Sequence, residues 1–247
     1  MATPANIIDV VSDQFGVARA TVAMQDRMLV TSGHRMITGR GRAARGSPEG
    51  AAALLLAVAA TPLSGPGIKE TAIHYERYSH LLAASPTGEL VTWPLKHLKQ
   101  LRAGHSLHEA VAAIIILLGR GVSQASDLFA DARPDANGIT TDLSMEVELA
   151  APTPSAAIVI RAHQWNAYPT GQFHPDDNLP VLDRDRVAMY ECRVEYSATF
   201  DDMQKYLETL PLHPIAGRRS PDLTQKRKFS LATLAHVAAL FSDKTKL

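Results

Sequence analysis

The stretch Val10–Ala60 constrains this chain more than any other part of it. It has the pattern of two short helices joined by a tight turn, an arginine-rich arm and a third, apolar helix. The first helix is indicated by apolar side chains at helical spacing, namely Ile7, Ile8, Val10, Val11 and Phe15. Gly16 follows where the turn requires a positive φ, which glycine adopts without steric cost. The sequence therefore predicts a helical corner at Gly16, with a second helix that ends at Gly33.

The second helix, residues 18–32, is expected to expose its N-terminal half. With Val22 and Leu29 facing the core, the side chains predicted to face solvent are Arg19, Ala20, Thr21, Met24 and Gln25. Arginine can bond to guanine in the DNA major groove and glutamine to adenine, whereas threonine can contact a phosphate or a thymine methyl. We therefore expect a recognition helix that meets bases through Arg19, Thr21 and Gln25.

A basic arm follows the second helix directly. The segment 33–46 (GHRMITGRGRAARG) contains no acid and contributes the arginines Arg35, Arg40, Arg42 and Arg45. Arginines outnumber acids in residues 1–46, although the whole chain is neutral, with 25 Lys+Arg and 25 Asp+Glu. Phosphate binding depends on local charge, so these four arginines are predicted to contact the DNA backbone or the minor groove.

The N-terminal part of the chain resembles a known class of proteins. Its pattern is VVSDQFGVARATVAMQDRMLVTSG, followed by GRGR and a small-apolar helix. This pattern is similar to the N-terminal helix-turn-helix of phage- and prophage-encoded DNA-binding proteins of bacteria, and to winged-helix regulators. The similarity covers roughly the first quarter of the chain and implies binding to double-stranded DNA. The pattern departs from the usual winged helix because no helix precedes the first one.

The remainder of the chain predicts an α+β fold. Ser47-Pro48-Glu49 starts the third helix, and the linker near Thr61-Pro62 separates a helix-turn-helix domain at 1–62 from a second domain at 67–247. Further helices are expected at 68–84, 95–101, 106–118, 200–210 and 230–241. Alternating apolar residues predict strands at 139–149, 156–162 and 187–198 in a small antiparallel sheet. Residues 123–138 and 163–185 are predicted to be loops, and 217–228 a basic segment that can add phosphate contacts.

No sequence motif points to catalysis. The single cysteine, Cys192, excludes an internal disulfide and a cysteine-based zinc site. The nearest approach to a metal site is one loop that contains His163, His174, Asp176 and Asp177, which is also ordinary loop chemistry. We therefore expect no enzyme activity, no cofactor and no bound metal. The sequence shows neither a signal peptide nor a membrane span, which predicts a soluble, cytoplasmic protein.

These observations favour a sequence-specific DNA-binding transcriptional regulator of bacterial or phage type, acting as a homodimer or higher oligomer. The main alternative is a phage DNA-packaging or assembly protein that recognises DNA through the same motif. Two further alternatives are a metal-dependent hydrolase or nuclease that uses the histidine-rich loop, and a helical scaffold protein without a nucleic-acid role.

Overall fold

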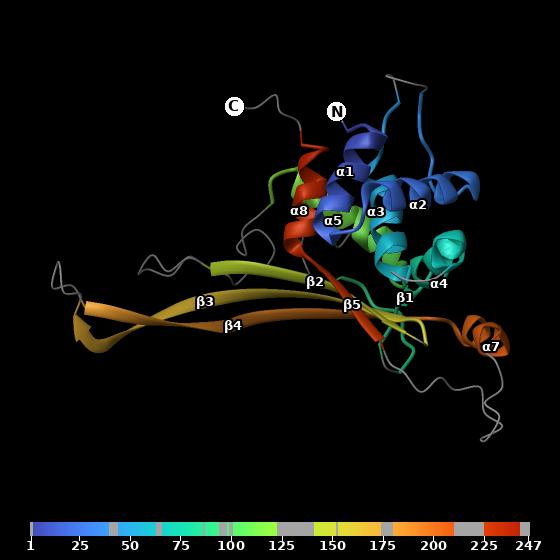
Figure 1. Cartoon of the computed structure of the whole chain (residues 1–247). Helices are drawn as coiled ribbons and strands as arrows, with labels where there is room; N and C mark the ends of the chain where they lie inside the picture. The colour runs from blue at the N-terminus through green and yellow to red at the C-terminus, as the bar shows by residue number, and fades with distance from the viewer. Residues whose placement is uncertain are drawn as a thin grey trace.

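A computed structural model of the chain shows a layer of helices packed on one face of an antiparallel sheet (Figure 1). The structure describes residues 2–39, 44–62, 66–85, 87–93, 98, 101–122, 141–151, 153–173, 180–209 and 225–242. Together, the helices and the sheet confirm the predicted α+β class.

Several of the helices begin at a residue whose side chain caps the first turn. Their bounds are α1 (Pro4–Phe15), α2 (Arg19–Thr31), α3 (Pro48–Ala60), η2 (Pro66–Glu70, a 3₁₀ helix), α4 (Thr71–Ser79), α5 (Leu107–Gly119), α7 (Phe200–Thr209) and α8 (Leu231–Ala239). The Ser47 hydroxyl accepts a hydrogen bond from the Gly50 N–H at 3.1 Å. At α5, Ser106 and Glu109 form a complete capping box. Helices α3 and α5 therefore begin within one residue of their predicted starts.

The core is continuous across the helical layer. Helix α3 is buried along almost its whole length because α1, α2, α4 and α5 surround it and β5 (Gln225–Ser230) contacts it. Buried residues of α1, such as Ile7, belong to the same apolar cluster as Ile114 of α5 and Val237 of α8. The predicted boundary between residues 62 and 67 is therefore not a boundary of the hydrophobic core.

The sheet has five strands in the order β1-β4-β3-β2-β5, and every pairing is antiparallel. The remaining strands are β1 (Leu82–Ala83), β2 (Thr141–Ala151), β3 (Ser155–Phe173) and β4 (Pro180–Ser197). Apolar side chains on the inner face, such as Val147, Ile158 and Val194, are buried against the helices. The three predicted strands are thus confirmed as parts of β2, β3 and β4.

Two of these strands are much longer than the sequence indicated. Strands β3 and β4 pair from Ser155↔Ser197 to Phe173↔Pro180, whereas β2 accompanies β3 only as far as Gln164. Beyond that point they form a two-stranded ribbon that extends past the helices (Figure 1). At about 3.3 Å per residue, the part after Gln164 is roughly 30 Å long. The prediction of a surface loop was therefore wrong for residues 163–173 and 180–185, whereas 174–179 lie outside the described residues.

The outer face of the sheet carries a network of ion pairs. Lys228 of β5 lies 3.3 Å from Glu146 and 2.9 Å from Glu148 of β2. Arg161 of β3 lies 3.6 Å from Glu146, and Arg193 of β4 lies 3.6 Å from Glu148. Because these cations and acids alternate across the strands, they stabilise pairing and balance one another's charge.

Other predictions met mixed outcomes. The helices predicted at 106–118, 200–210 and 230–241 are confirmed as α5, α7 and α8. The one at 68–84 was too long, since α4 ends at Ser79 and the chain continues into β1. Most of the helix at 95–101 and all of 123–138 lie outside the described residues, as does 217–224 of the basic segment. Within the described part of the chain, no helix is long and apolar enough to cross a membrane.

Candidate nucleic-acid interface

The corner between α1 and α2 is closed by backbone hydrogen bonds. Gly16 has φ 62° and donates its N–H to the Asp13 carbonyl, while Val17 donates to the Ser12 carbonyl at 3.1 Å. These two bonds are the pair that defines a Schellman motif. The Ser12 hydroxyl donates in turn to the Val17 carbonyl at 2.6 Å. The turn residues 16–18 therefore hold the two helices at a defined angle, as the sequence predicted.

Helix α2 presents one ridge to solvent. Ala20, Met24, Arg27 and Thr31 follow one another at helical spacing and are all exposed, with Met24 at 53%. The opposite side of the helix, which includes Val22 and Leu29, is buried. Arg27 was not among the expected contact residues, although its position three residues after Met24 places it on the same ridge.

Gln25 does not belong to this ridge, and its expected exposure was wrong. It lies three residues after Val22 and four before Leu29, so it shares their inward face and is only 3% exposed. Thr21 is half-buried at the edge between the two faces. Of the three residues expected to meet bases, Arg19 is thus the one that is exposed.

Arg35 is buried rather than directed at a partner, which contradicts its expected phosphate contact. Its guanidinium forms an ion pair with Asp26 of α2, and both side chains are buried. A Cβ added to Gly50, in the first turn of α3, would lie 3.2 Å from Arg35 Nε, so the arginine fills the space beside α3. Burial lowers the pKa of Arg35 to about 10, which leaves it charged at neutral pH. Arg35 therefore joins the base of the arm to α2 and α3.

The arm folds back on itself as a short hairpin. Thr38 and Arg45 form an antiparallel bridge, in which the Arg45 N–H donates to the Thr38 carbonyl at 2.8 Å. Figure 1 shows this segment rising from the helices on the side away from the sheet. Arg45 is exposed there, whereas Arg40 and Arg42, between the paired positions, lie outside the described residues.

The start of α2 is open toward solvent. Its N-cap residue, Ala18, has no side chain that can accept a hydrogen bond from the first turn, in contrast to Thr3 of α1 and Ser47 of α3. Arg19 Nε lies 2.5 Å from Asp9 Oδ1, and both side chains are about half exposed. An exposed pair of this kind contributes at most about 1 kcal/mol, so an approaching phosphate can replace Asp9.

Of the four residues considered as a metal site in the sequence, the structure describes His163. His163 lies in β3 with its Nδ1 3.5 Å from the Ser144 hydroxyl, whereas His174, Asp176 and Asp177 lie outside the described residues. Over the residues whose side chains the structure describes, no group of three His, Cys, Asp or Glu residues is arranged to hold a metal ion.

The chain was compared with protein families, with curated protein sequences and with solved structures, and none of the three comparisons finds a match.

Proposed function

We propose that this protein is a sequence-specific DNA-binding protein that acts as a transcriptional regulator of bacterial or phage type. The observation that carries the proposal is the juxtaposition of an exposed helix ridge with a projecting basic hairpin. Helix α2 follows a three-residue turn and exposes Ala20, Met24 and Arg27, while the hairpin that holds Arg45 begins a few residues after α2 ends. In a helix-turn-helix protein the second helix enters the major groove, and an adjacent arginine-bearing loop can follow the minor groove or the phosphates.

The contacts divide into two kinds. Arg19 and Arg27 are suited to phosphates or to guanine, and the exposed methyl groups of Ala20 and Met24 are suited to thymine methyls. The arginines of the basic arm, which by sequence are Arg40, Arg42 and Arg45, supply affinity that does not depend on the base sequence. Gln25 and Arg35 take no part in either set because they are buried.

A unit of this size covers a short half-site, so we expect a homodimer that binds two half-sites about one helical turn apart.

Binding to a random-sequence DNA duplex, measured by fluorescence anisotropy at several salt concentrations, tests the proposal. The wild type is expected to bind more weakly as salt rises. Arg40→Ala/Arg42→Ala should make the slope of log K against log salt shallower by roughly one for each phosphate that the hairpin no longer neutralises. Arg27→Ala should weaken DNA binding, because it removes a cation from the exposed ridge of α2. Arg120→Ala, an exposed arginine at the end of α5, serves as the matched control and should leave the slope unchanged.

Two results would contradict the proposal. The first is an absence of salt-dependent binding at low salt, which would make the corner a purely structural one. The second is an equal change of slope in the Arg120→Ala control and in the hairpin variant. If binding occurs, selection from a randomised duplex pool identifies the preferred site. If the protein instead forms a ring-shaped oligomer and binds DNA without a preferred site, the result would favour the alternative of a phage DNA-packaging or assembly protein.

A further inference from the structure

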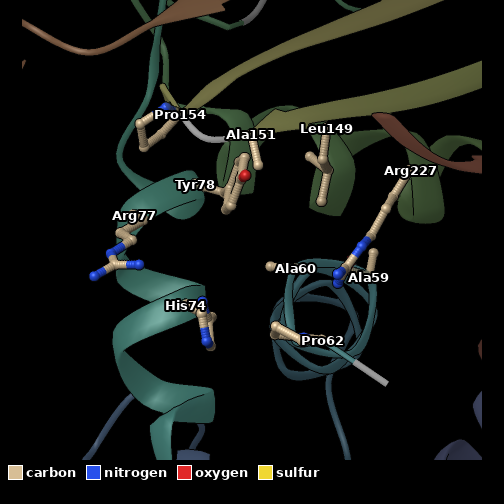
Figure 2. A pocket seen from close by; sticks show the side chains of 10 residues that line it. All are labelled: Ala59, Ala60, Pro62, His74, Arg77, Tyr78, Leu149, Ala151, Pro154 and Arg227. Carbon is tan, nitrogen blue, oxygen red and sulfur yellow. The ribbon is translucent and has the colours of Figure 1, made fainter. Parts of the chain in front are cut away.

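A small cavity lies where the C-terminal end of α3, helix α4 and the inner face of the sheet meet (Figure 2). Its volume is about 100 Å³. Figure 2 shows Arg227 reaching from β5 toward the end of α3, with His74 on the facing side of the cavity on α4. Ala60 and Leu149 supply apolar walls between them.

The cavity is lined by basic side chains and by no carboxylate among the described residues. His74, Arg77 and Arg227 all border it, although the guanidinium of Arg77 points away from Ala60 in Figure 2. Arg227 Nη1 donates to the Ala59 carbonyl at 3.1 Å, which fixes the direction of the guanidinium at the cavity edge. A guanidinium has five N–H groups in a fixed fork, so the same side chain can bond to α3 and to a ligand.

His74 has an unused hydrogen-bonding atom at this place. Its Nε2 is buried and makes no hydrogen bond within the described part of the chain. Glu70 Oε2 lies 3.6 Å away, which is within ion-pair range of a protonated His74 but beyond hydrogen-bonding distance, and the Glu70 side chain is 55% exposed. A buried imidazole nitrogen without a partner costs free energy, and a ligand oxygen would satisfy it once the ring is protonated.

Two cations lie close enough to His74 to affect its protonation. The pKa of His74 is lowered, first by burial and then by Arg77, with a further contribution from Arg227, whereas Glu70 acts in the opposite direction. Two cations near a third ionisable group disfavour its protonation because like charges repel. An anion in the cavity would reverse this effect and stabilise the protonated ring.

We propose that this cavity binds a small oxyanion, such as phosphate, sulfate or a short carboxylate, with Arg227 and His74 as its charged partners. The site is separate from the DNA-binding function proposed above. Its size limits the ligand: about 100 Å³ is several times the space that one water needs, but well below the roughly 300 Å³ of pockets for drug-sized molecules. Affinity rises as the pH falls, since the bound anion favours protonated His74 in the presence of Glu70, Arg77 and Arg227.

Sulfate is the best first probe because its charge does not change near neutral pH. We would titrate the full-length, ¹⁵N-labelled protein with sodium sulfate in place of chloride at constant ionic strength and follow the imidazole resonances. The His74 signal should shift in a saturable way, and its titration midpoint should move to higher pH. His236, exposed on α8, provides the internal control and should not saturate. Repeating the titration with phosphate and with acetate shows whether the site prefers a tetrahedral ion or a carboxylate.

Arg227→Met should weaken sulfate binding at least tenfold, whereas the control Arg120→Met should leave it unchanged. Arg227 also bonds to the end of α3, so His74→Gln gives a second test that does not disturb that bond. In this variant, the gain in Tm with sulfate should fall below that of the wild type and of Arg120→Met. Equal, non-saturating shifts at His74 and His236 would overturn the proposal, as would equal sulfate responses in all three variants. Neither outcome depends on whether the protein binds DNA.

Discussion

Replacing Arg35 by methionine should destabilise the protein by about 3–5 kcal/mol, because the change leaves the Asp26 carboxylate buried without its cation. The side chains of Arg35 and Asp26 are only 0% and 9% exposed, so solvent cannot take the place of the missing partner. Methionine is of similar length and keeps most of the packing against α3. Since a typical protein is stable by about 5–15 kcal/mol, this single change removes a large fraction of the total.

Removal of both charges together should not destabilise the protein. In Asp26→Leu/Arg35→Met neither charge remains buried, so the double variant should be as stable as the wild type or more stable by about 1–4 kcal/mol. Asp26→Leu alone should be costly, because the Arg35 guanidinium then remains buried without its acid. The difference between the double variant and the sum of the two singles measures the coupling between these residues.

Urea unfolding followed by circular dichroism measures each free energy through the midpoint and the slope. Asp9 and Arg19 give a matched control, because they are also an Asp–Arg pair that includes α2 but are about half exposed. Arg19→Met should therefore cost less than about 1 kcal/mol. If Arg35→Met costs no more than Arg19→Met, the Arg35 pair is not desolvated, and the structural role assigned to it is wrong.

Three further changes test separate parts of the fold. Gly16→Ala should cost about 1–2 kcal/mol in urea unfolding, because φ is 62° while an added Cβ meets no atom within 4 Å. Ser106→Ala should cost about 1 kcal/mol in the same assay through loss of the α5 cap, with an unchanged result contradicting the capping box. Burial lowers the pKa of His105, so the unfolded chain takes up the proton first, and stability falls as the pH drops below about 6.5. His105→Gln should show a shallower fall in Tm than the wild type and the exposed-site control His236→Gln, and equal slopes would refute this assignment.

The sequence predicted the helices well because their local signals agree with their final environment. Ser47 marks the predicted start of α3, and the structure places a side-chain cap there, as it also does at Thr3 and Ser106. The corner at Gly16 was predictable for the same reason, since the ability to adopt a positive φ is a property of glycine itself. These features depend on neighbours within a few positions along the chain.

The ribbon and the edge strand could not be predicted in this way. Strand β5 alternates exposed and inward positions, with Lys226 and Lys228 outside and Phe229 inside, but its cations made it resemble a basic connection. The lysine charge is balanced by Glu146 and Glu148 of β2, which are far away in sequence. The ribbon after Gln164 is likewise defined by strand pairing rather than by an apolar face.

The exposure of the candidate interface residues was predicted only in part. The helical period alone places Gln25 with Val22 and Leu29, so its burial was implicit in the same pattern that predicted the helix. The burial of Arg35 was not implicit, because it depends on Asp26 facing inward and on the space beside Gly50. An arginine in a basic arm therefore cannot be assigned to DNA from composition alone.

The N-terminal helices α1, α2 and α3 depend on the rest of the chain for their stability, and this leads to a prediction about fragments. Helix α3 is buried from Gly50 to Ala60, and its three consecutive leucines, Leu54 to Leu56, point in directions that α1 and α2 cannot all cover. A fragment of residues 1–62 would expose the faces that contact α4 and α5, at about 1.5–3 kcal/mol for each large side chain. Such a loss is comparable with the whole stability of a domain this small, so the fragment should be unfolded or aggregated by circular dichroism and NMR. A soluble fragment with a dispersed amide spectrum and a cooperative melt would show instead that the N-terminal helices form an independent domain, despite the continuous core.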